Sequence, residues 1–328
     1  MSRRLPAGAC LARAAVLLLG AVAVLSAPIR LRAAEPQPPL PEALQRASRL
    51  LEQVRIERDV VYGKAGDRKL MLDVVLPLQP SAKRLPAVVF IHGGGWRAGN
   101  KLGGLPNVAR LAATGNYVGV SVGYRLSGEA IWPAQIHDCK AAIRFLRAEA
   151  ERFGIDPEKI GVWGSSAGGH LVSLLGTSGD VAELEGENGS PGQSSRVTCV
   201  VDFCGPSDFT GILERRPRDE APSAVTALLG GSLKEKEEEA KQASPVTWVS
   251  KDDPPFLIVH GTEDNIVPLE QAETLHQALK KVGADVTFVK IVGGGHGIGG
   301  PEIARRVEAF FEKHLRGRDV EVSSEPIR

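Results

Sequence analysis

The chain has 328 residues, of which 43% are hydrophobic and 24% charged, so it is long enough to bury one large core. Its formal net charge is only +1, and neither half carries a basic stripe, which removes the electrostatic basis for binding nucleic acid. Aromatic residues make up 5% of the chain, too few for the stacking platforms of single-strand-binding proteins. We therefore expect no nucleic-acid partner.

The N-terminus is typical of an export signal. Three arginines precede the apolar run Ala14–Leu25, and two small residues, Ser26 and Ala27, follow it. Such a run is short for a transmembrane helix, although an uncleaved N-terminal anchor is the alternative. We expect residues 1–27 to be a signal peptide, and the mature protein to be periplasmic or secreted without stable membrane insertion.

Three cysteines lie beyond this signal, Cys139, Cys199 and Cys204. They are too few to form a disulfide framework for a domain of this size, so we expect buried free thiols. The spacing between Cys199 and Cys204 would place them on opposite faces of a continuous strand.

The rest of the chain divides into four expected segments. Residues 28–50 are rich in proline and predict a linker with a short helix. Residues 51–316 predict the catalytic domain. Within it the alternation of strands and helices stops over 205–253, which predicts a lid-like insertion whose charged run is a solvated helix face. Residues 317–328 predict a flexible tail.

Short apolar runs alternate with helix-period stretches along the catalytic domain. The expected strands are Val54–Tyr62, Lys69–Leu76, Ala87–His92, Tyr117–Val122, Lys159–Trp163, Val197–Phe203, Phe256–His260 and Val286–Val292. Expected helices lie between Pro133 and Gly154 and over Ser166–Leu175, Leu269–Lys281 and Pro301–Leu315. This alternation predicts a mostly parallel, doubly wound sheet of about eight strands, with its site at the carboxyl ends of the strands. No helix separates the first two strands, which could therefore form an antiparallel edge.

The sequence Gly164-Ser165-Ser166-Ala167-Gly168 lies between an expected strand and an expected helix. A nucleophile elbow of the G-x-S-x-G type requires this context, because the sharp turn leaves no room for side chains two residues either side of the serine. The pattern places Ser166, and not Ser165, in the nucleophile position. The start of the helix that follows favours a developing oxyanion.

A glycine-rich segment, His92-Gly93-Gly94-Gly95-Trp96, follows an earlier strand. Glycines there let backbone N–H groups point into a cavity, so we expect Gly94, Gly95 and Ala167 to form an oxyanion hole. A flexible turn is the alternative interpretation. Trp96 and Ser165 are expected at the substrate pocket, although core packing explains a tryptophan equally well.

Two further loops supply an acid and a base. Asp264 follows the strand Phe256–His260, where its carboxylate could orient an imidazole; Glu263 is its rival, and turn capping is the structural alternative. His296 lies among glycines after the last strand and is expected to act as the base, since its ordinary pKa lies near neutrality. The other candidates, His170, His260, His276 and His314, are expected to be structural. The order Ser–Asp–His matches that of α/β-hydrolases.

On these motifs the chain resembles the α/β-hydrolase superfamily of serine esterases, in particular its hormone-sensitive-lipase-like and feruloyl/acetyl-xylan-esterase-like branches. The resemblance covers Val54–Leu315 and includes Tyr124-Arg125-Leu126 and the stretch Pro133–Arg147. It implies hydrolysis of acetyl or feruloyl esters on carbohydrate, with neither a metal nor an organic cofactor. One fold hosts many substrates, so the resemblance does not establish this activity.

We therefore predict a carboxylic ester hydrolase acting on a small-molecule or polysaccharide ester. Amidase, peptidase or arylformamidase-like activity is the first alternative, because the same three residues also cleave amides. A noncatalytic binding protein of the same fold is the remote alternative. The short, polar insertion 205–253 favours short acyl groups over long lipid chains. The oligomeric state does not follow from the sequence.

Overall fold

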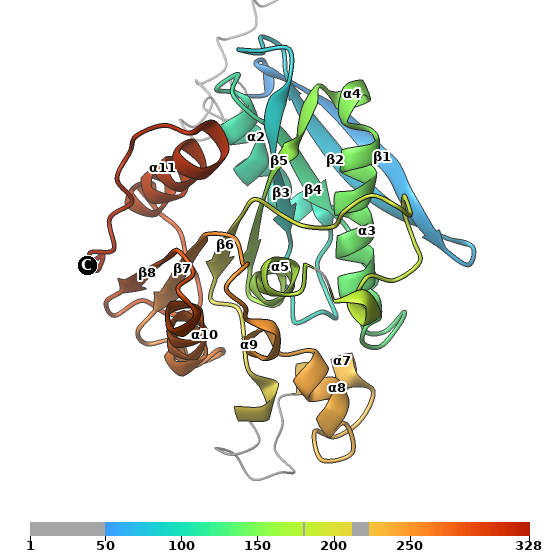
Figure 1. Cartoon of the computed structure of the whole chain (residues 1–328), viewed down its shortest axis with the longest axis vertical. Helices are drawn as coiled ribbons and strands as arrows, with labels where there is room; N and C mark the ends of the chain where they lie inside the picture. Colours follow the sequence, from blue (N-terminus) through green and yellow to red (C-terminus); the bar gives the residue numbers. More distant parts are fainter. Residues whose placement is uncertain (1–49, 180, 212–222) are drawn as a thin grey trace, which may run out of the picture. The chain divides into compact units, whose positions relative to one another are not determined.

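The computed structural model describes residues 50–179, 181–211 and 223–328. The predicted signal peptide and nearly all of the linker lie outside these residues. The described chain contains an eight-stranded sheet in the order β1-β2-β4-β3-β5-β6-β7-β8 (Figure 1). Its strands are β1 (Val54–Ala65), β2 (Arg68–Pro77), β3 (Leu85–Ile91), β4 (Val118–Val122), β5 (Ile155–Ser165), β6 (Cys199–Phe203), β7 (Phe256–Gly261) and β8 (Val286–Ile291).

The strand directions put one long parallel block beside an antiparallel edge. Strand β1 pairs antiparallel with β2, and β2 with β4, whereas every other pair is parallel. The turn between β1 and β2 contains Gly66, whose φ of 58° suits a residue without a side chain. The prediction of an antiparallel edge is confirmed. Because β3, β5, β6, β7 and β8 run the same way, the loops that follow them all emerge at one edge of the sheet.

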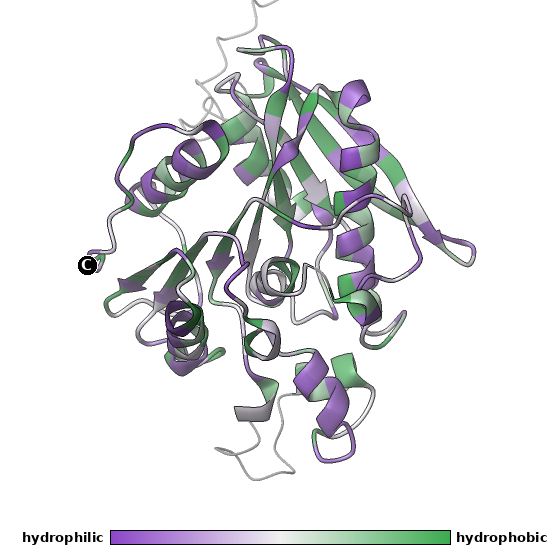
Figure 2. Cartoon of the chain, in the orientation of Figure 1, coloured by the Kyte–Doolittle hydropathy of each residue, from purple (hydrophilic) through white to green (hydrophobic). Residues whose placement is uncertain are grey.

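Helices cover both faces of the sheet (Figure 1). One core cluster joins the sheet to α3 (Ala134–Ala148), α5 (Ala167–Thr177) and α10 (Leu269–Val282). The other joins it to α2 (Leu105–Ala112) and α11 (Pro301–Arg316). The central strands are buried on both sides and accordingly read as continuous apolar runs (Figure 2). The predicted doubly wound sheet is confirmed.

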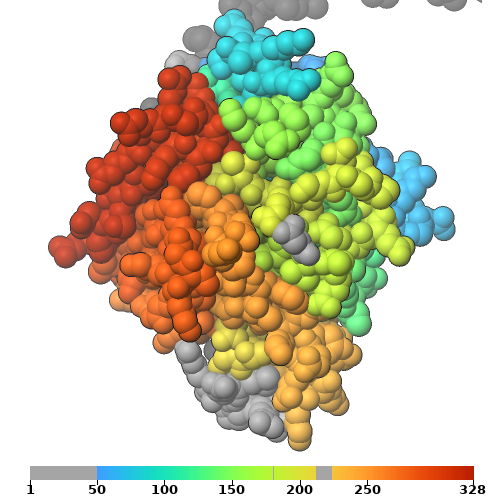
Figure 3. Space-filling model, viewed as in Figure 1, coloured from blue at the N-terminus to red at the C-terminus, as the bar shows by residue number. Residues whose placement is uncertain are grey.

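Smaller elements complete the described chain. They are η1 (Lys101–Gly104), α4 (Ala150–Phe153), η2 (Ala182–Leu184), α7 (Ser223–Leu229), α8 (Glu237–Gln242) and α9 (Pro245–Trp248). The last three belong to the segment 205–253, which lies between β6 and β7 in the sequence; α7 and α8 lie at the lower end of the view in Figure 3. The charged run around α8 is mostly exposed, with Ala240 turned into the core, so the predicted solvated face is confirmed.

The prediction of a flexible tail over 317–328 is wrong. Ile327 forms a parallel bridge with Ile291, donating its N–H to the Lys290 carbonyl at 2.9 Å and accepting from the Val292 N–H at 2.8 Å. Val322 and Ile327 also pack against the second core cluster. Strand β8 lies at the edge of the sheet, and its unpaired backbone groups provide the hydrogen bonds that hold the chain end.

In the part of the chain that the structure describes, no helix is long and apolar enough to cross a membrane.

Candidate active site

The elbow between β5 and α5 depends on the absence of two side chains. A Cβ on Gly164 would collide with the Gly168 carbonyl oxygen, and one on Gly168 would collide with the carbonyl oxygen of Ile91. Between them, Ser166 has φ 57° and ψ −122°, a conformation that costs a non-glycine residue about 1–3 kcal/mol. Its N–H donates to the Phe203 carbonyl at 2.8 Å, which anchors the turn on the neighbouring strand β6. Ser166 is thereby held immediately before the first residue of α5.

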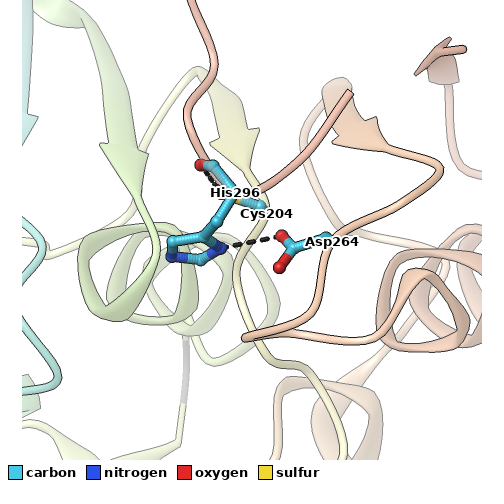
Figure 4. A group of neighbouring side chains, drawn as sticks. All are labelled: Cys204, Asp264 and His296. Carbon is cyan, nitrogen blue, oxygen red and sulfur yellow. Dashed lines mark hydrogen bonds and ion pairs between the residues drawn. The ribbon is translucent and has the colours of Figure 1, made fainter. Parts of the chain in front are cut away.

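Ser166, His296 and Asp264 form one hydrogen-bonded chain, although they lie far apart in the sequence. The His296 Nε2 lies 2.9 Å from the Ser166 Oγ, and the His296 Nδ1 lies 2.7 Å from the Asp264 Oδ2 (Figure 4 shows the second contact). Since a carboxylate can only accept, the Nδ1 carries the imidazole proton and the bare Nε2 accepts from the serine hydroxyl. The structure therefore brings together the three residues that the sequence singled out.

Asp264 is held in its charged form. Its side chain is buried, and burial by itself raises the pKa of a carboxyl group. The hydrogen bond from His296 and those from the Val267 and Ile266 N–H groups, at 2.9 and 2.8 Å, outweigh burial and hold the pKa of Asp264 below its ordinary value. Among the described residues, the carboxylate that bonds to His296 is that of Asp264 and not that of Glu263, its rival in the sequence.

The loops that carry Asp264 and His296 are locked to each other. The N–H of Glu263 donates to the Gly294 carbonyl at 2.8 Å, and the N–H of Gly293 donates to the Thr262 Oγ1 at 2.9 Å. A Cβ on Gly261 would collide with the Gly294 carbonyl oxygen, so this close approach requires glycine. Sequence reasoning did not identify Gly261 or Thr262; the glycine directly after a strand was the one available signal.

The glycine-rich loop after β3 lies against the elbow. A Cβ on Gly93 would come within 2.7 Å of the Ser165 carbonyl oxygen, and Gly94 and Gly95 have φ values of 115° and 58°. Beneath the loop, the ring of Tyr124 stacks on His92 at 4.4 Å, and its hydroxyl donates to the His92 carbonyl at 3.0 Å. These contacts fix the loop, which argues against a flexible turn.

Arg125, the second residue of the Tyr124-Arg125-Leu126 motif, has a structural role. The Arg125 guanidinium forms two hydrogen bonds with the buried Asp138 of α3, from Nε to Oδ2 at 2.8 Å and from Nη2 to Oδ1 at 2.7 Å, and the Arg125 backbone N–H donates to the same Oδ2 at 2.9 Å. This bidentate pair ties the strand end that supports the glycine loop to helix α3.

A fully buried histidine connects the glycine loop, the elbow helix and the segment 205–253. The Trp96 Nε1–H donates to the His170 Nδ1 at 3.2 Å, and the His170 Nε2–H donates to the Ala243 carbonyl at 2.6 Å. Burial lowers the pKa of His170 to about 4, so this residue stays neutral and keeps both contacts. Phe209 stacks on the same ring. The prediction that His170 is structural is consistent with these contacts.

A small apolar cavity of about 110 Å³ opens beside the Ser166 hydroxyl. It is lined by Gly95, Trp96, Ser166, Ala167, Pro206, Ala224, Val225, Ile266, Val267, Pro268 and Gln271. Of the two residues expected at the substrate pocket, Trp96 lines this cavity and Ser165 does not. Ser165 is the last residue of β5, so its side chain alternates away from the cavity onto which the elbow turns Ser166.

The pocket residues from distant segments could not be recognised in the sequence. Gln271 on α10 is buried and accepts from the N–H groups of Ser207 and Asp208, both at 2.8 Å, which positions Pro206 at the cavity wall. Val225 belongs to α7 and reaches the same cavity. None of these residues has a motif of its own.

Within the described ranges, one group of three side chains could offer ligands to a metal ion. These are Cys204, Asp264 and His296, whose ligand atoms all lie within 4.8 Å of one another (Figure 4). Asp264 and His296 are already hydrogen-bonded to each other, and burial raises the pKa of the Cys204 thiol to about 12, so the thiol is protonated. The chemistry of this group fits proton transfer better than metal binding.

Cys139, Cys199 and Cys204 are free and buried, as predicted, but no continuous strand runs through Cys199 and Cys204 to place them on opposite faces. Both belong to the same core cluster. Strand β6 ends at Phe203, and Cys204 then takes a positive φ of 44°, which breaks the alternation of side chains. The Cys204 thiol donates to the His296 carbonyl at 3.5 Å.

The other histidines weighed as the base, His276, His314 and His260, have partners other than Ser166. His276 belongs to α10 and contacts Phe288, and His314 belongs to α11 and contacts Phe310. His260 is buried below Asp264 and makes its closest hydrogen bond with the Val267 carbonyl.

Comparison with known proteins identifies the family. A model of the family described as BD-FAE matches residues 72–279. Among curated proteins, Esterase LipC of Mycobacterium tuberculosis is 34% identical over 246 residues, covering 73% of this chain and 59% of LipC. Esterase LipQ of the same organism is 30% identical over 244 residues, covering 73% of this chain and 56% of LipQ. The chain thus spans a little over half the length of these curated relatives.

Solved structures agree in fold. A truncated carbohydrate esterase from gut microbiota is 33% identical with a TM-score of 0.73, over 80% of this chain and 96% of that one. An esterase of Thermogutta terrifontis with propionate bound is 26% identical with a TM-score of 0.65, over 82% of this chain and 97% of that one. The doubly wound sheet, the elbow and these likenesses together show that the chain belongs to the BD-FAE family of the α/β-hydrolase superfamily.

Proposed function

We propose that this protein is a carboxylic ester hydrolase in which Ser166, His296 and Asp264 act as a catalytic triad. The observation that carries the proposal is the continuous hydrogen-bonded chain from the Ser166 Oγ through His296 to the ionised Asp264. Such a chain lets a neutral imidazole remove the serine proton, while the carboxylate holds the imidazole in the required tautomer and stabilises its charged form. The esterase names of the relatives support the same activity.

The reaction then proceeds in two halves. The Ser166 Oγ bonds to the ester carbonyl carbon while its proton moves to the His296 Nε2; the tetrahedral species collapses, its C–O bond to the alcohol breaks, and His296 protonates the departing alcohol. Water next attacks the acyl-enzyme as His296 takes its proton, and Ser166 regains a proton as the carboxylic acid leaves. The N–H groups of Gly94, Gly95 and Ala167 stabilise the oxyanion in both halves. In support of this assignment, Gly95 and Ala167 line the cavity that holds Ser166.

The size of the cavity favours a short acyl group. A dry cavity of about 150 Å³ is enough to hold benzene. The volume beside Ser166 is smaller, about 110 Å³, and its walls are mostly apolar. Acetyl and propionyl groups therefore fit better than a feruloyl group or a long lipid chain. Propionate bound to the Thermogutta terrifontis esterase supports this range of acyl groups.

We further propose that the alcohol half of the ester is a carbohydrate and that the substrate is met outside the cytoplasm. The likeness to a carbohydrate esterase at 33% identity supports the first part. The export signal expected over residues 1–27 motivates the second part and lies outside the described residues. Fractionation of the native host, with detection of the mature N-terminus, tests the location.

Turnover of purified protein tests the activity and its substrate together. We expect the protein to hydrolyse p-nitrophenyl acetate and to release acetate from acetylated xylan. It should cleave the matching p-nitroanilides only slowly. Ser166→Ala serves as the inactive control. Cleavage of anilides at a rate comparable to esters would favour an amidase, and no turnover of any acyl substrate would favour a noncatalytic binding protein. A rate maximum at long acyl chains with interfacial activation would make the protein a lipase.

A further inference from the structure

A second histidine lies directly below the Asp264 carboxylate. His260, near the end of β7, has its side chain fully buried. Its Nε2 lies 2.8 Å from the Val267 carbonyl oxygen and 3.3 Å from the Asp264 Oδ2. The proposed reaction does not use His260, because the proton passes only between Ser166 and His296.

The neighbours of His260 determine its protonation. Both groups at the Nε2 are acceptors, since a carbonyl oxygen never donates and Asp264 is ionised, so the Nε2 carries the proton. The Nδ1 is buried without a hydrogen-bond partner in the described structure, and a second proton there would leave a buried N–H without an acceptor. Burial accordingly lowers the pKa of His260, although Val267 and Asp264 act in the opposite direction. His260 is therefore a neutral donor with a single N–H.

This N–H holds one end of the loop that carries the carboxylate, and through Val267 it is linked to Asp264. The Val267 N–H donates to the Asp264 Oδ1, and the Val267 carbonyl accepts from His260. The Asp264 Oδ2, which accepts from the His296 Nδ1 at 2.7 Å, lies 3.3 Å from the same His260 Nε2 as a close electrostatic contact, while the hydrogen bond of His260 goes to Val267. One side chain thus holds the backbone that orients the carboxylate, and it places the positive end of its N–H bond close to the oxygen on which His296 depends.

We propose that His260 is a positioning residue that orients Asp264 and moderates the charge it presents to His296. The proposal rests on the proposed triad. If the His260 donor is lost, more negative charge remains on the Oδ2 for His296, which favours the imidazolium form and raises the pKa of His296. The acid limb of kcat/KM should then move to higher pH, and a less well oriented imidazole should lower kcat.

Several other titratable groups lie near His260 and Asp264. Glu270, in the first turn of α10, and His296 act on His260 in opposite directions. Cys204, after β6, lies close to Asp264 but is a neutral thiol. On β8, the Lys290 ammonium is paired with Glu273 of α10 at 2.6 Å. All of these remain in place when only His260 is changed.

Two substitutions separate the donor from the bulk of the ring. Gln in His260→Gln places an amide N–H near the Nε2 position, whereas Met in His260→Met has a similar length and no donor. His260→Asn is a second donor-deficient variant for the case that the methionine protein does not fold, because its amide is too short to reach the carboxylate. Melting temperatures show the structural cost of each change.

The first readout is the pKa of His296 from NMR titration of its imidazole, with the signal assigned by a His296→Gln protein. The second is the pH dependence of kcat and KM for p-nitrophenyl acetate. For His260→Met we expect a higher His296 pKa and a kcat about tenfold lower, the rate equivalent of one hydrogen bond, with KM changed less than kcat. His260→Gln should lie close to the wild type in both readouts.

Three results would overturn the proposal. These are an unchanged His296 pKa in both donor-deficient variants, equal losses in the glutamine and methionine variants, and a fall in melting temperature alone. The NMR titration does not require turnover, so it remains informative if the wild-type protein hydrolyses no ester. In that case the proposed function fails, while the effect of His260 on the Asp264–His296 pair is still measured.

Discussion

The wall of the small cavity should set the acyl chain length that the enzyme accepts. Val225 of α7 lines this cavity and is only 4% exposed. Val225→Ala removes two methyl groups and leaves room for about two more acyl carbons. Each buried methylene contributes about 0.8 kcal/mol, which corresponds to roughly fourfold in kcat/KM. For an acyl chain two carbons longer, we therefore expect a gain of about fifteenfold relative to acetate.

A series of p-nitrophenyl esters measures this effect directly. The ratio of kcat/KM for butyrate, hexanoate and octanoate to that for acetate is compared between the wild type and Val225→Ala. Val172→Ala is the matched control, because Val172 is a fully buried core residue of α5 that does not line the cavity. It should lower the melting temperature and leave the chain-length profile unchanged. An unaltered profile in Val225→Ala, or the same change in both variants, would refute the assignment of this cavity to the acyl group.

Other changes test the nucleophile elbow, the proposed triad and the buried carboxyl group of Asp202. Ser166→Ala should lower kcat by at least about 10³-fold with folding retained, and Ser165→Ala should be mild; the opposite pattern would contradict the elbow register. Asp264→Asn should lower kcat by about 10³-fold or more, and a fully active variant would exclude the triad. In the wild type, kcat/KM should fall on the acid side as His296 gains a proton, and a flat acid limb would contradict its role as the base. Burial raises the pKa of Asp202 to about 6. As pH rises from about 4 to 6, Asp202 therefore ionises in the unfolded chain before it does so in the folded protein, which favours unfolding. Over that range the free energy of unfolding of the wild type should fall by up to about 3 kcal/mol relative to that of Asp202→Asn. If denaturant titrations gave the same pH dependence of the free energy of unfolding for both proteins, this prediction would be refuted.

Local sequence patterns were sufficient for the elbow and the order of the proposed triad. A serine flanked by two glycines, between a strand and a helix, predicts a sharp turn. Glycine is required at 164 and 168 because side chains there would collide with the neighbouring backbone. The parallel strands also bring their carboxyl ends to one edge, which places Asp264 and His296 near Ser166. These predictions depend only on short-range sterics and on the direction of the strands.

Tertiary packing decided the rest. The cavity wall combines Val225 and Gln271 from helices that no sequence motif links to Ser166. The tail follows β8 because an edge strand offers free backbone groups, which composition does not reveal. In the sequence, His260 is indistinguishable from an ordinary strand residue, because its hydrogen bond to the Val267 carbonyl exists only in the folded loop 264–267. Contacts between residues distant in the sequence depend on the volume and hydrogen-bonding capacity left by the rest of the fold, which no single segment encodes.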